Sequence, residues 1–280
     1  MAIDGKTERY GIIGNPVRHS MSPAMHNAAF AELGMNRVYV PMEVSDIEQG
    51  IVGLRALGFQ GVSVTVPHKE AVIPFLDEID PVAEKIGAVN TLVFQKEQDG
   101  RVILRGLNTD WLGANTALAE KINLHQSRVL VIGAGGSAKA VGFGLVQAGA
   151  EVIISNRTAE TGKALADWLG CTFVRLEEVA DVSADVLMNT TSVGMEPNHE
   201  GIVVPPSLLS EFSVVMDIVY APLETRLLRE AKAAGCQTID GLAMLLYQGA
   251  AQFKIWTGVS APQLIMRSAL EEELRRRTVA

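Results

Sequence analysis

A glycine-rich turn in the middle of the chain has the residue types needed to hold a dinucleotide. The apolar run Val129–Ile132 predicts a buried strand, which leads into Gly133-Ala134-Gly135-Gly136-Ser137-Ala138 and a helical pattern. In such a unit the first glycine permits the tight turn, the second lets the backbone approach a pyrophosphate, and the small Ala138 lets helix and strand pack closely. The helix N-terminus offers N–H groups and a positive dipole end to the phosphates. Because strand and helix signals flank the glycines, we predict a dinucleotide site rather than a plain turn.

The end of the next predicted strand favours NADP over NAD. An NAD site usually has Asp or Glu there to bond the ribose 2′-hydroxyl, but this chain has Asn156, Arg157 and Thr158. A carboxylate would repel a 2′-phosphate, whereas Arg157 can bind one bidentately. The alternative for Arg157 is a solvated surface charge, although the helix dipole disfavours arginine at a helix start.

Taken alone, each of four further polar clusters can be explained by an ordinary structural role. Ser22 before a proline suits a helix start, Asp110 suits an N-cap, and Asn90 suits a turn. Lys69 is more often a solvated helix charge than a catalyst. The clusters are Gly14–Pro16 with His19–Pro23, Val62–Lys69, Gly87–Thr91 with Gly106–Asp110, and Gly241–Leu245 with Gln248.

The elements that must position these residues alternate between apolar strand-like runs and amphipathic helical stretches. This alternation predicts an α/β protein with mostly parallel sheets. The predicted strands are Tyr10–Gly14, Val38–Met42, Gly61–Val66, Arg128–Gly133, Glu151–Asn156, Val186–Asn189 and Val214–Val219. The predicted helices are Ser22–Gly34, Asp46–Gly58, Pro67–Asp77, Asp110–Lys121 and Ala138–Gly149.

Two breaks in this alternation predict two domains. The strand-like runs Ala88–Gln95 and Arg101–Leu107 flank Gln98–Gly100, a hairpin signal, so the sheet of residues 1–109 is expected to be mixed. Residues 110–240 are expected to form a Rossmann-like domain. From Gly241 onward the chain looks helical, and helices in 241–280 are expected to complete the first domain, leaving a cleft between the two.

As a set, these motifs resemble the shikimate dehydrogenase family from Gly11 to about Leu270. The resemblance implies an N-terminal substrate domain, an NADP domain, and a place in aromatic amino acid biosynthesis. The substrate would be a cyclic polyol carboxylate, first of all shikimate, interconverted with 3-dehydroshikimate. The implied substrate-binding residues are Ser20, Ser22, Ser63, Thr65, Asn90, Asp110, Tyr220 and Gln248. The implied cofactor-binding residues are the turn 133–138, Asn156, Arg157, Thr158, Thr190, Ser192, Ile218 and Gly241.

The resemblance places Lys69 and Asp110 beside the carbon that is oxidised. Oxidation of a secondary alcohol needs a hydride acceptor and a base, and Lys69 is the best candidate for the base. Asp110 would hold Lys69 and the substrate hydroxyl in register. In the reductive direction the Lys69 ammonium would polarise the ketone and donate the proton. His19 and His68 lie beside these motifs but are weaker candidates, and no spacing of residues suggests a metal.

Three residues depart from the family pattern. Ser63 stands where asparagine is usual and would reach less far toward a ring hydroxyl. Trp111 stands where glycine is usual and could reshape the pocket or bury Lys69. Thr161 stands where a second basic residue often binds the 2′-phosphate, and Lys163 could partly compensate. The alternatives therefore remain a dehydrogenase of quinate, of an aminoshikimate or of another cyclic hydroxy acid, a folate-type dehydrogenase, or a nucleotide-binding sensor without catalysis.

The charge and composition of the chain exclude some classes of binding partner. The 280-residue chain has 48% apolar residues, which is ordinary for a globular protein. Its net charge of −8 argues against nucleic acid or an anionic membrane surface as partner. Cys171 and Cys236 have no metal spacing and are expected to be small reduced residues. We find no secretory signal or apolar run of bilayer length, so a cytoplasmic protein is expected. Exposed strand edges in the first domain could pair two subunits as a homodimer.

Overall fold

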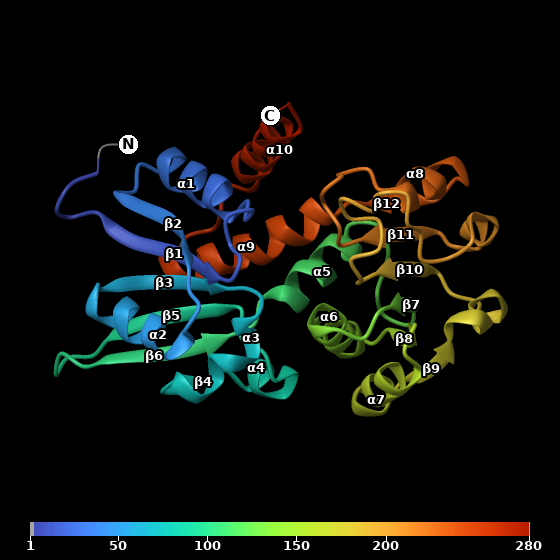
Figure 1. Ribbon diagram of the computed structural model, residues 1–280, viewed down its shortest axis with the longest axis horizontal. Coiled ribbons are helices and arrows are strands. Elements are labelled where there is room, and N and C mark those ends of the chain that lie inside the picture. The colour runs from blue at the N-terminus through green and yellow to red at the C-terminus, as the bar shows by residue number, and fades with distance from the viewer. Residues whose placement is uncertain (1–2, 280) are drawn as a thin grey trace. The chain divides into compact units, whose positions relative to one another are not determined.

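The computed structural model of the chain describes residues 3–279. The described chain divides into two compact units, the first made of residues 3–109 and 248–279 and the second of Asp110–Tyr247 (Figure 1). The second unit therefore extends beyond the expected end at residue 240. The reason is that α9 (Gly241–Thr257) is one continuous helix, and its residues Ala243, Met244 and Tyr247 pack against the core of the second unit.

The first unit contains a six-stranded mixed sheet with the order β2-β1-β3-β5-β6-β4. Parallel pairing joins β1 to β2, β1 to β3 and β4 to β6, while β3–β5 and β5–β6 are antiparallel. The expected hairpin is confirmed, because β5 and β6 pair in register from Thr91 with Leu107 to Lys96 with Val102. The strands are β1 (Glu8–Gly14), β2 (Arg37–Glu43), β3 (Phe59–Val64), β4 (Glu78–Ile79), β5 (Thr91–Lys96) and β6 (Val102–Leu107).

Helices cover both faces of this sheet. On one face, Ile51 and Leu54 of α2 pack with Ile13, Val62 and other sheet residues. On the other, Trp256 of α9 lies so close to β3 that a Cβ on Gly61 would be 2.4 Å from its ring. The helices of this unit besides α9 are α1 (Ser22–Glu32), α2 (Ile47–Ala56), α3 (His68–Ala71), the 3₁₀ turn η1 (Ile73–Phe75), α4 (Pro81–Ile86) and α10 (Gln263–Val279).

The helix expected over Pro67–Asp77 is wrong. The structure has the single turn α3 and then η1, with a break at Val72. Pro74 explains the break, because it has no N–H to donate to residue 70 and its ring would clash with the carbonyl of that residue in a continuous helix.

The second unit contains a six-stranded, wholly parallel sheet with the order β12-β11-β10-β7-β8-β9. The strand order reverses between β7 and β10, and in such sheets ligands bind outside the carboxyl ends of the strands at the reversal. The strands are β7 (Arg128–Ile132), β8 (Glu151–Asn156), β9 (Thr172–Arg175), β10 (Val186–Asn189), β11 (Val214–Asp217) and β12 (Gln237–Ile239).

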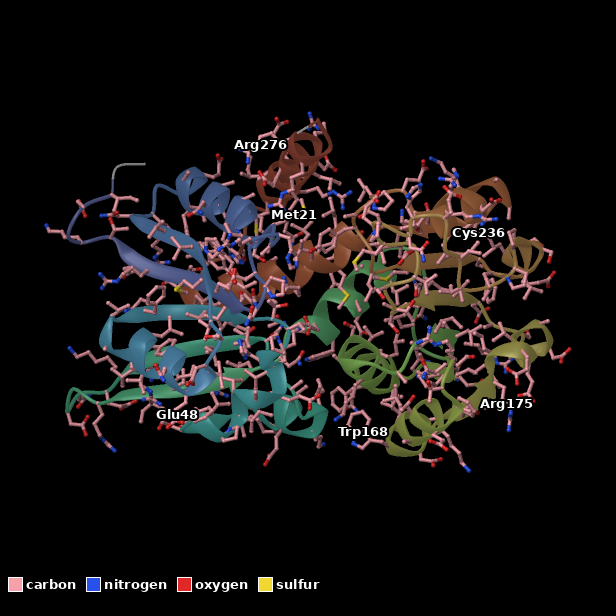
Figure 2. All side chains as sticks on the ribbon, in the orientation of Figure 1. Met21, Glu48, Trp168, Arg175, Cys236 and Arg276 are labelled. Atoms are coloured by element: carbon pink, nitrogen blue, oxygen red, sulfur yellow. The ribbon has the colours of Figure 1, made fainter. Side chains whose placement is uncertain are left out.

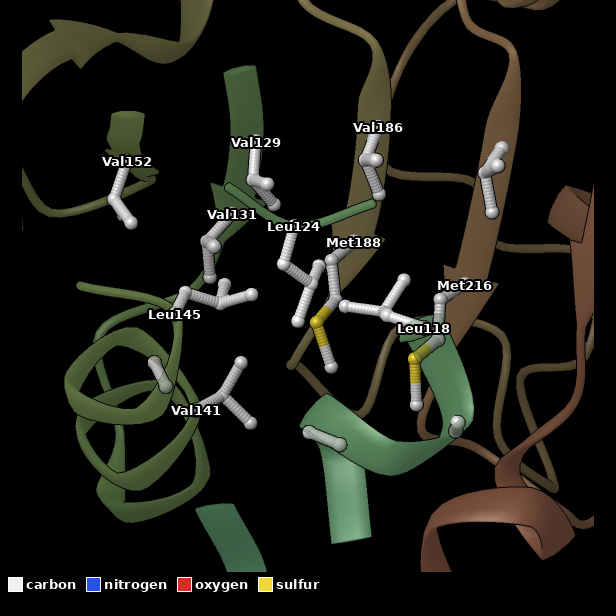
Figure 3. Close-up of a cluster of buried hydrophobic side chains, with 14 of the residues drawn as sticks. Leu118, Leu124, Val129, Val131, Val141, Leu145, Val152, Val186, Met188 and Met216 are labelled. Carbon is white, nitrogen blue, oxygen red and sulfur yellow. The ribbon is translucent and has the colours of Figure 1, made fainter. Parts of the chain in front are cut away.

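Apolar clusters fill both faces of the second sheet. Figure 3 shows one of them, where Leu118, Val141 and Leu145 pack on strand residues such as Val131 and Met188. The other face packs against Val179, Leu209 and Leu227. The elements that supply these residues are α5 (Asp110–Ala119), α6 (Gly136–Gln147), α7 (Ala159–Leu169), η2 (Leu176–Asp181), η3 (Pro206–Glu211) and α8 (Arg226–Ala233).

Two further properties of residues 3–279 bear on the sequence analysis. The described helices include none with the length and apolar composition of a membrane-spanning segment. Both cysteines are free: Cys236 is buried and its thiol donates to the Leu209 carbonyl, and Cys171 is half-buried.

Candidate active site

The glycine turn of the second unit joins β7 to α6 as the sequence indicates. Gly133 has a φ of 126°, and a Cβ there would lie 2.4 Å from the Thr190 hydroxyl, so the position requires glycine. Gly135 and Gly136 face open space, because a Cβ on either would meet no heavy atom within 4 Å. No side chain caps the N-terminus of α6, and Ala138 is fully buried against the core. Uncovered N–H groups beside open space fit the pyrophosphate of a dinucleotide.

The turn after β8 presents a cation without a carboxylate beside it. The Asn156 amide donates to the Thr158 carbonyl at 3.0 Å and to the Thr161 hydroxyl at 2.8 Å, which closes the turn around Arg157. Arg157 is exposed, and none of the ion pairs found within residues 3–279 involves it. Thr161, which replaces a basic residue of the family pattern, thus holds the turn. Lys163 is exposed on α7.

A second cation nearby along the chain is engaged by an aromatic ring. The ammonium of Lys139 on α6 lies 5.0 Å from the ring centroid of Trp168, which is labelled in Figure 2. A cation at this distance is attracted by the face of the indole.

A buried carboxylate connects the loops after β10 and β11. Asp217 accepts hydrogen bonds from the Asn189 amide, the Val219 N–H and the Thr225 hydroxyl. Burial raises the pKa of Asp217 to about 6 even though these three bonds lower it. Asn189 in turn accepts from the Thr191 N–H and donates to the Val193 carbonyl. Asp217 therefore fixes both loops at the carboxyl edge of the sheet.

The residues expected at the nicotinamide end lie on these two loops or beside them. Thr190 donates to the Ile132 carbonyl at 2.7 Å and is buried, while Ser192 is exposed. Ile218 and Tyr220 follow Asp217 and are half-buried. A Cβ on Gly241 would lie 2.4 Å from the Ile218 carbonyl oxygen, so glycine is required where α9 begins.

In the first unit, Lys69 and Asn90 come from segments that are hydrogen-bonded together. Lys69 is half-buried on α3, and its carbonyl accepts from the Val89 N–H at 2.8 Å. Asn90 is buried, and its carbonyl accepts from Val64 at the end of β3. Its side chain accepts from the Thr109 N–H at 2.8 Å, directly before Asp110 in the chain.

Gln248 reaches the same place from α9. Its side-chain oxygen lies 3.4 Å from the Asn90 amide nitrogen, and Gln248 is buried. Asp110 is buried as the first residue of α5. Thr65 is half-buried, and the loop after β1 approaches it closely, because a Cβ on Gly14 would be 2.4 Å from the Thr65 methyl group.

Ser63 has its hydroxyl committed inside the protein. It lies 2.6 Å from the Tyr39 hydroxyl and 2.9 Å from the Gln252 side-chain oxygen. Burial raises the pKa of Tyr39, although the hydroxyls of Ser63 and Ser22 lower it, so the phenol stays protonated. Tyr39 and Gln252 were not selected from the sequence. The available signal for Gln252 was its place four residues after Gln248, on the same face of a helix.

The loop that carries Ser20 and Ser22 is held from the C-terminal helix. The Arg277 guanidinium donates to the carbonyls of His19, at 2.5 Å, and Ser20, at 3.1 Å. The Ser20 hydroxyl accepts from the Ser22 N–H at 3.3 Å. The sequence did not indicate Arg277, since a cation near the end of a helix is common.

The remaining candidates have structural partners. His68 is buried, and its Nε2 lies 2.6 Å from the Val44 carbonyl, which makes that nitrogen the donor; His19 is exposed in the loop. The Trp111 ring packs edge-on against Phe143 at 6.4 Å, and α6 can approach it because position 144 is glycine. Among the described residues no group of three or more His, Cys, Asp or Glu is placed to hold a metal.

The parallel sheet with its glycine turn, and the polar set around Lys69 and Asn90 in a separate α/β unit, define the class as a two-unit nucleotide-dependent dehydrogenase. Family models match the shikimate dehydrogenase substrate binding domain at residues 12–92, shikimate / quinate 5-dehydrogenase at 116–197, and the shikimate 5′-dehydrogenase C-terminal domain at 241–271. A shikimate dehydrogenase (NADP(+)) of Thermococcus kodakarensis is 50% identical, over 96% of this chain and 98% of its own. The chain belongs to the shikimate dehydrogenase family.

Solved structures agree over the same length. A crystal structure of shikimate dehydrogenase in complex with NADP+ has a TM-score of 0.90 and 42% identity, covering 98% of each chain. That of shikimate 5-dehydrogenase from Thermus thermophilus in complex with NADP(H) and shikimate has a TM-score of 0.85 and 41% identity, covering 95% of this chain and 99% of the other.

Proposed function

We propose that this protein is an NADP-dependent shikimate dehydrogenase, which interconverts shikimate and 3-dehydroshikimate. The observation that carries the proposal is the similarity of the whole chain, both units included, to dehydrogenases whose structures hold NADP and shikimate. A small cyclic hydroxy acid is thereby favoured as substrate.

The second unit is proposed to hold NADP. The turn 133–138 would bind the pyrophosphate with the free N–H groups of α6, and Arg157, with Asn156 and Thr158, would bind the 2′-phosphate. Thr190, Ser192, Ile218 and Gly241 would line the nicotinamide end. When bound, NADP+ supplies the acceptor for the hydride that leaves the alcohol carbon.

The first unit is proposed to bind the substrate and to move its proton. Ser20, Ser22, Thr65, Asn90 and Gln248 would bond the ring hydroxyls and the carboxylate, and Tyr220 would also contact the substrate. Lys69 would take the hydroxyl proton during oxidation and return it during reduction, with Asp110 holding the lysine in register. Because the hydroxyl of Ser63 is bonded to Tyr39 and Gln252, its proposed contribution to substrate binding is indirect.

A substrate panel tests this proposal. Shikimate, quinate and an aminoshikimate are each offered with NADP+ and with NAD+, and the reduced nicotinamide is followed by absorbance. We expect turnover of shikimate with NADP+ at an ordinary rate of about 1–10³ s⁻¹. Turnover of quinate alone, or with NAD+ alone, would refute the proposal.

Two secondary proposals concern the state of the protein in the cell. A homodimer would pair an exposed sheet edge, and β2 forms one edge of the sheet in the first unit. Light scattering coupled to gel filtration measures the mass, and a monomer at micromolar concentration contradicts the dimer. A cytoplasmic location is proposed from the composition, and cell fractionation checks it.

A further inference from the structure

A buried glutamine on α9 connects two strands of the first unit, β3 and β5. Gln252 is 1% exposed and lies one helical turn beyond Gln248. Its amide nitrogen donates to the Asn90 carbonyl at 3.0 Å and to the Thr91 hydroxyl at 2.9 Å. Its amide oxygen accepts from the Ser63 hydroxyl at 2.9 Å. Both amide hydrogens and the amide oxygen of Gln252 therefore have hydrogen-bond partners within the protein.

The orientation of this amide is fixed by a partner that can only accept. A backbone carbonyl has no proton, so the group facing the Asn90 carbonyl must be the Gln252 NH₂, and its oxygen must face Ser63. Ser63 consequently donates to Gln252 and accepts from the Tyr39 hydroxyl at 2.6 Å. Along this part of the chain of bonds, Tyr39 therefore donates to Ser63 and Ser63 donates to Gln252.

The same reasoning continues to Asn90. Thr91 accepts from Gln252 and so donates its own proton to the Asn90 side-chain oxygen at 2.7 Å. The Thr109 N–H, which can only donate, meets the same oxygen. The Asn90 amino group lies 3.4 Å from the Gln248 side-chain oxygen and 3.0 Å from the Thr109 hydroxyl, which is also 3.2 Å from the Asn90 side-chain oxygen.

We propose that Gln252 is a positioning residue for substrate binding, which acts through Asn90. The directed chain Tyr39–Ser63–Gln252–Thr91–Asn90 holds the Asn90 amide with its NH₂ toward Gln248, which is itself proposed to bind the substrate. The substrate atom at Asn90 is then an acceptor, either a hydroxyl lone pair or a carboxylate oxygen. The inference rests on the proposed function and adds to it a residue that does not touch the substrate.

Steady-state kinetics of four variants test this role. Gln252→Met keeps the length of the side chain and removes its hydrogen bonds. Phe253→Leu is the matched control, because Phe253 is an equally buried neighbour on α9 that packs on Phe30 and takes no part in the chain of bonds. The third variant is Asn90→Ala, and the fourth combines it with Gln252→Met.

We expect Gln252→Met to raise the KM for shikimate about tenfold, the effect of losing roughly one well-made hydrogen bond, with the KM for NADP+ within about twofold and kcat within about threefold. Phe253→Leu should leave both KM values within about twofold at a similar loss of Tm. With Asn90→Ala already present, Gln252→Met should change the KM for shikimate by less than about twofold, because the residue it positions is gone.

Other results overturn the inference. If Gln252→Met resembles Phe253→Leu in both KM values, or if its effect is undiminished beside Asn90→Ala, then Gln252 is merely part of the core. Should Gln252→Met fail to fold, Thr91→Val breaks the same chain with an isosteric side chain and must raise the KM for shikimate. A wild-type protein that does not oxidise shikimate refutes the proposed function, whereas an active wild type with unaffected variants refutes only the positioning role.

Discussion

Replacement of His26 by leucine should remove a specific loss of stability in mild acid. His26 is fully buried on α1, stacked on Tyr39 at 4.5 Å, and neither ring nitrogen has a hydrogen-bond partner among the described residues. Burial lowers the pKa of His26 to about 3. The ring therefore stays neutral in the folded protein while the unfolded chain binds a proton near the ordinary value of 6.5.

The sign and size of the effect follow from this difference. A lowered histidine pKa means that the unfolded state binds more protons between pH 6.5 and 3, so folding stability is lost as the pH falls. From pH 7 to pH 5 the loss from this one group is about 2 kcal/mol, and it approaches about 5 kcal/mol near pH 3. Leucine cannot titrate, and it also removes two unpartnered polar atoms from the core, which offsets the lost ring stacking.

Urea unfolding at pH 7 and pH 5 measures this difference. It is followed by tryptophan fluorescence, to which Trp256 contributes with its ring centroid 5.3 Å from that of His26. The stability difference between His26→Leu and wild type should shift by about 2 kcal/mol in favour of the variant on acidification. His125→Gln, at an exposed histidine, is the matched control and should show no such shift. If wild type and His26→Leu lose equal stability between the two pH values, the buried neutral ring is not the cause.

Three further predictions concern activity. Lys69→Ala should lower kcat by about 10²–10⁴ with modest change in KM, since it removes the proton-transfer group, and near-normal turnover in steady-state assays would refute that role. Arg157→Ala should raise the KM for NADP+ about 10- to 100-fold and leave the KM for NAD+ within about twofold, because only the 2′-phosphate loses a charge-assisted bond. Equal effects on both KM values would show that Arg157 does not bind the 2′-phosphate. Arg277→Ala should raise the KM for shikimate about three- to tenfold by freeing the Ser20 loop, whereas its neighbour Arg276→Ala, which removes only a surface ion pair with Glu273, should not. Identical kinetics of these last two variants would exclude a role for the Arg277 contact.

The strands that the sequence missed are short strands at sheet edges, whereas the edge strand β2, which has seven residues, was predicted. Central strands such as β7 and β10 are covered on both faces, so they read as unbroken apolar runs. The missed strands β4, β9 and β12 each lie at a sheet edge and have two to four residues. An edge strand buries less surface and a short one shows no period, so neither signal could develop.

The site divides in the same way between local and long-range information. The glycine turn is set by residues adjacent in the chain, so its need for small residues at 133 and 138 can be read directly from their order. The partners of Ser63 cannot, because Gln252 lies 189 residues away and meets it only when α9 packs on the sheet. From the sequence, Ser63 is interpreted as a shortened ligand for the substrate. In the structure its hydroxyl is bonded to both Tyr39 and Gln252.

The direction of those bonds decides whether a polar side chain of this set can present a donor or an acceptor to a ligand. Ser63, Thr91 and Asn90 each have both a donor and an acceptor, and from the sequence any of them could present either to a substrate. Two backbone groups remove that freedom, because the Asn90 carbonyl can only accept and the Thr109 N–H can only donate. Each side chain between them must then donate or accept accordingly, and the Asn90 amino group is left to face Gln248. The recognition chemistry proposed for Asn90 thus depends on backbone geometry set by the pairing of β3, β5 and β6 as much as on the side chains themselves.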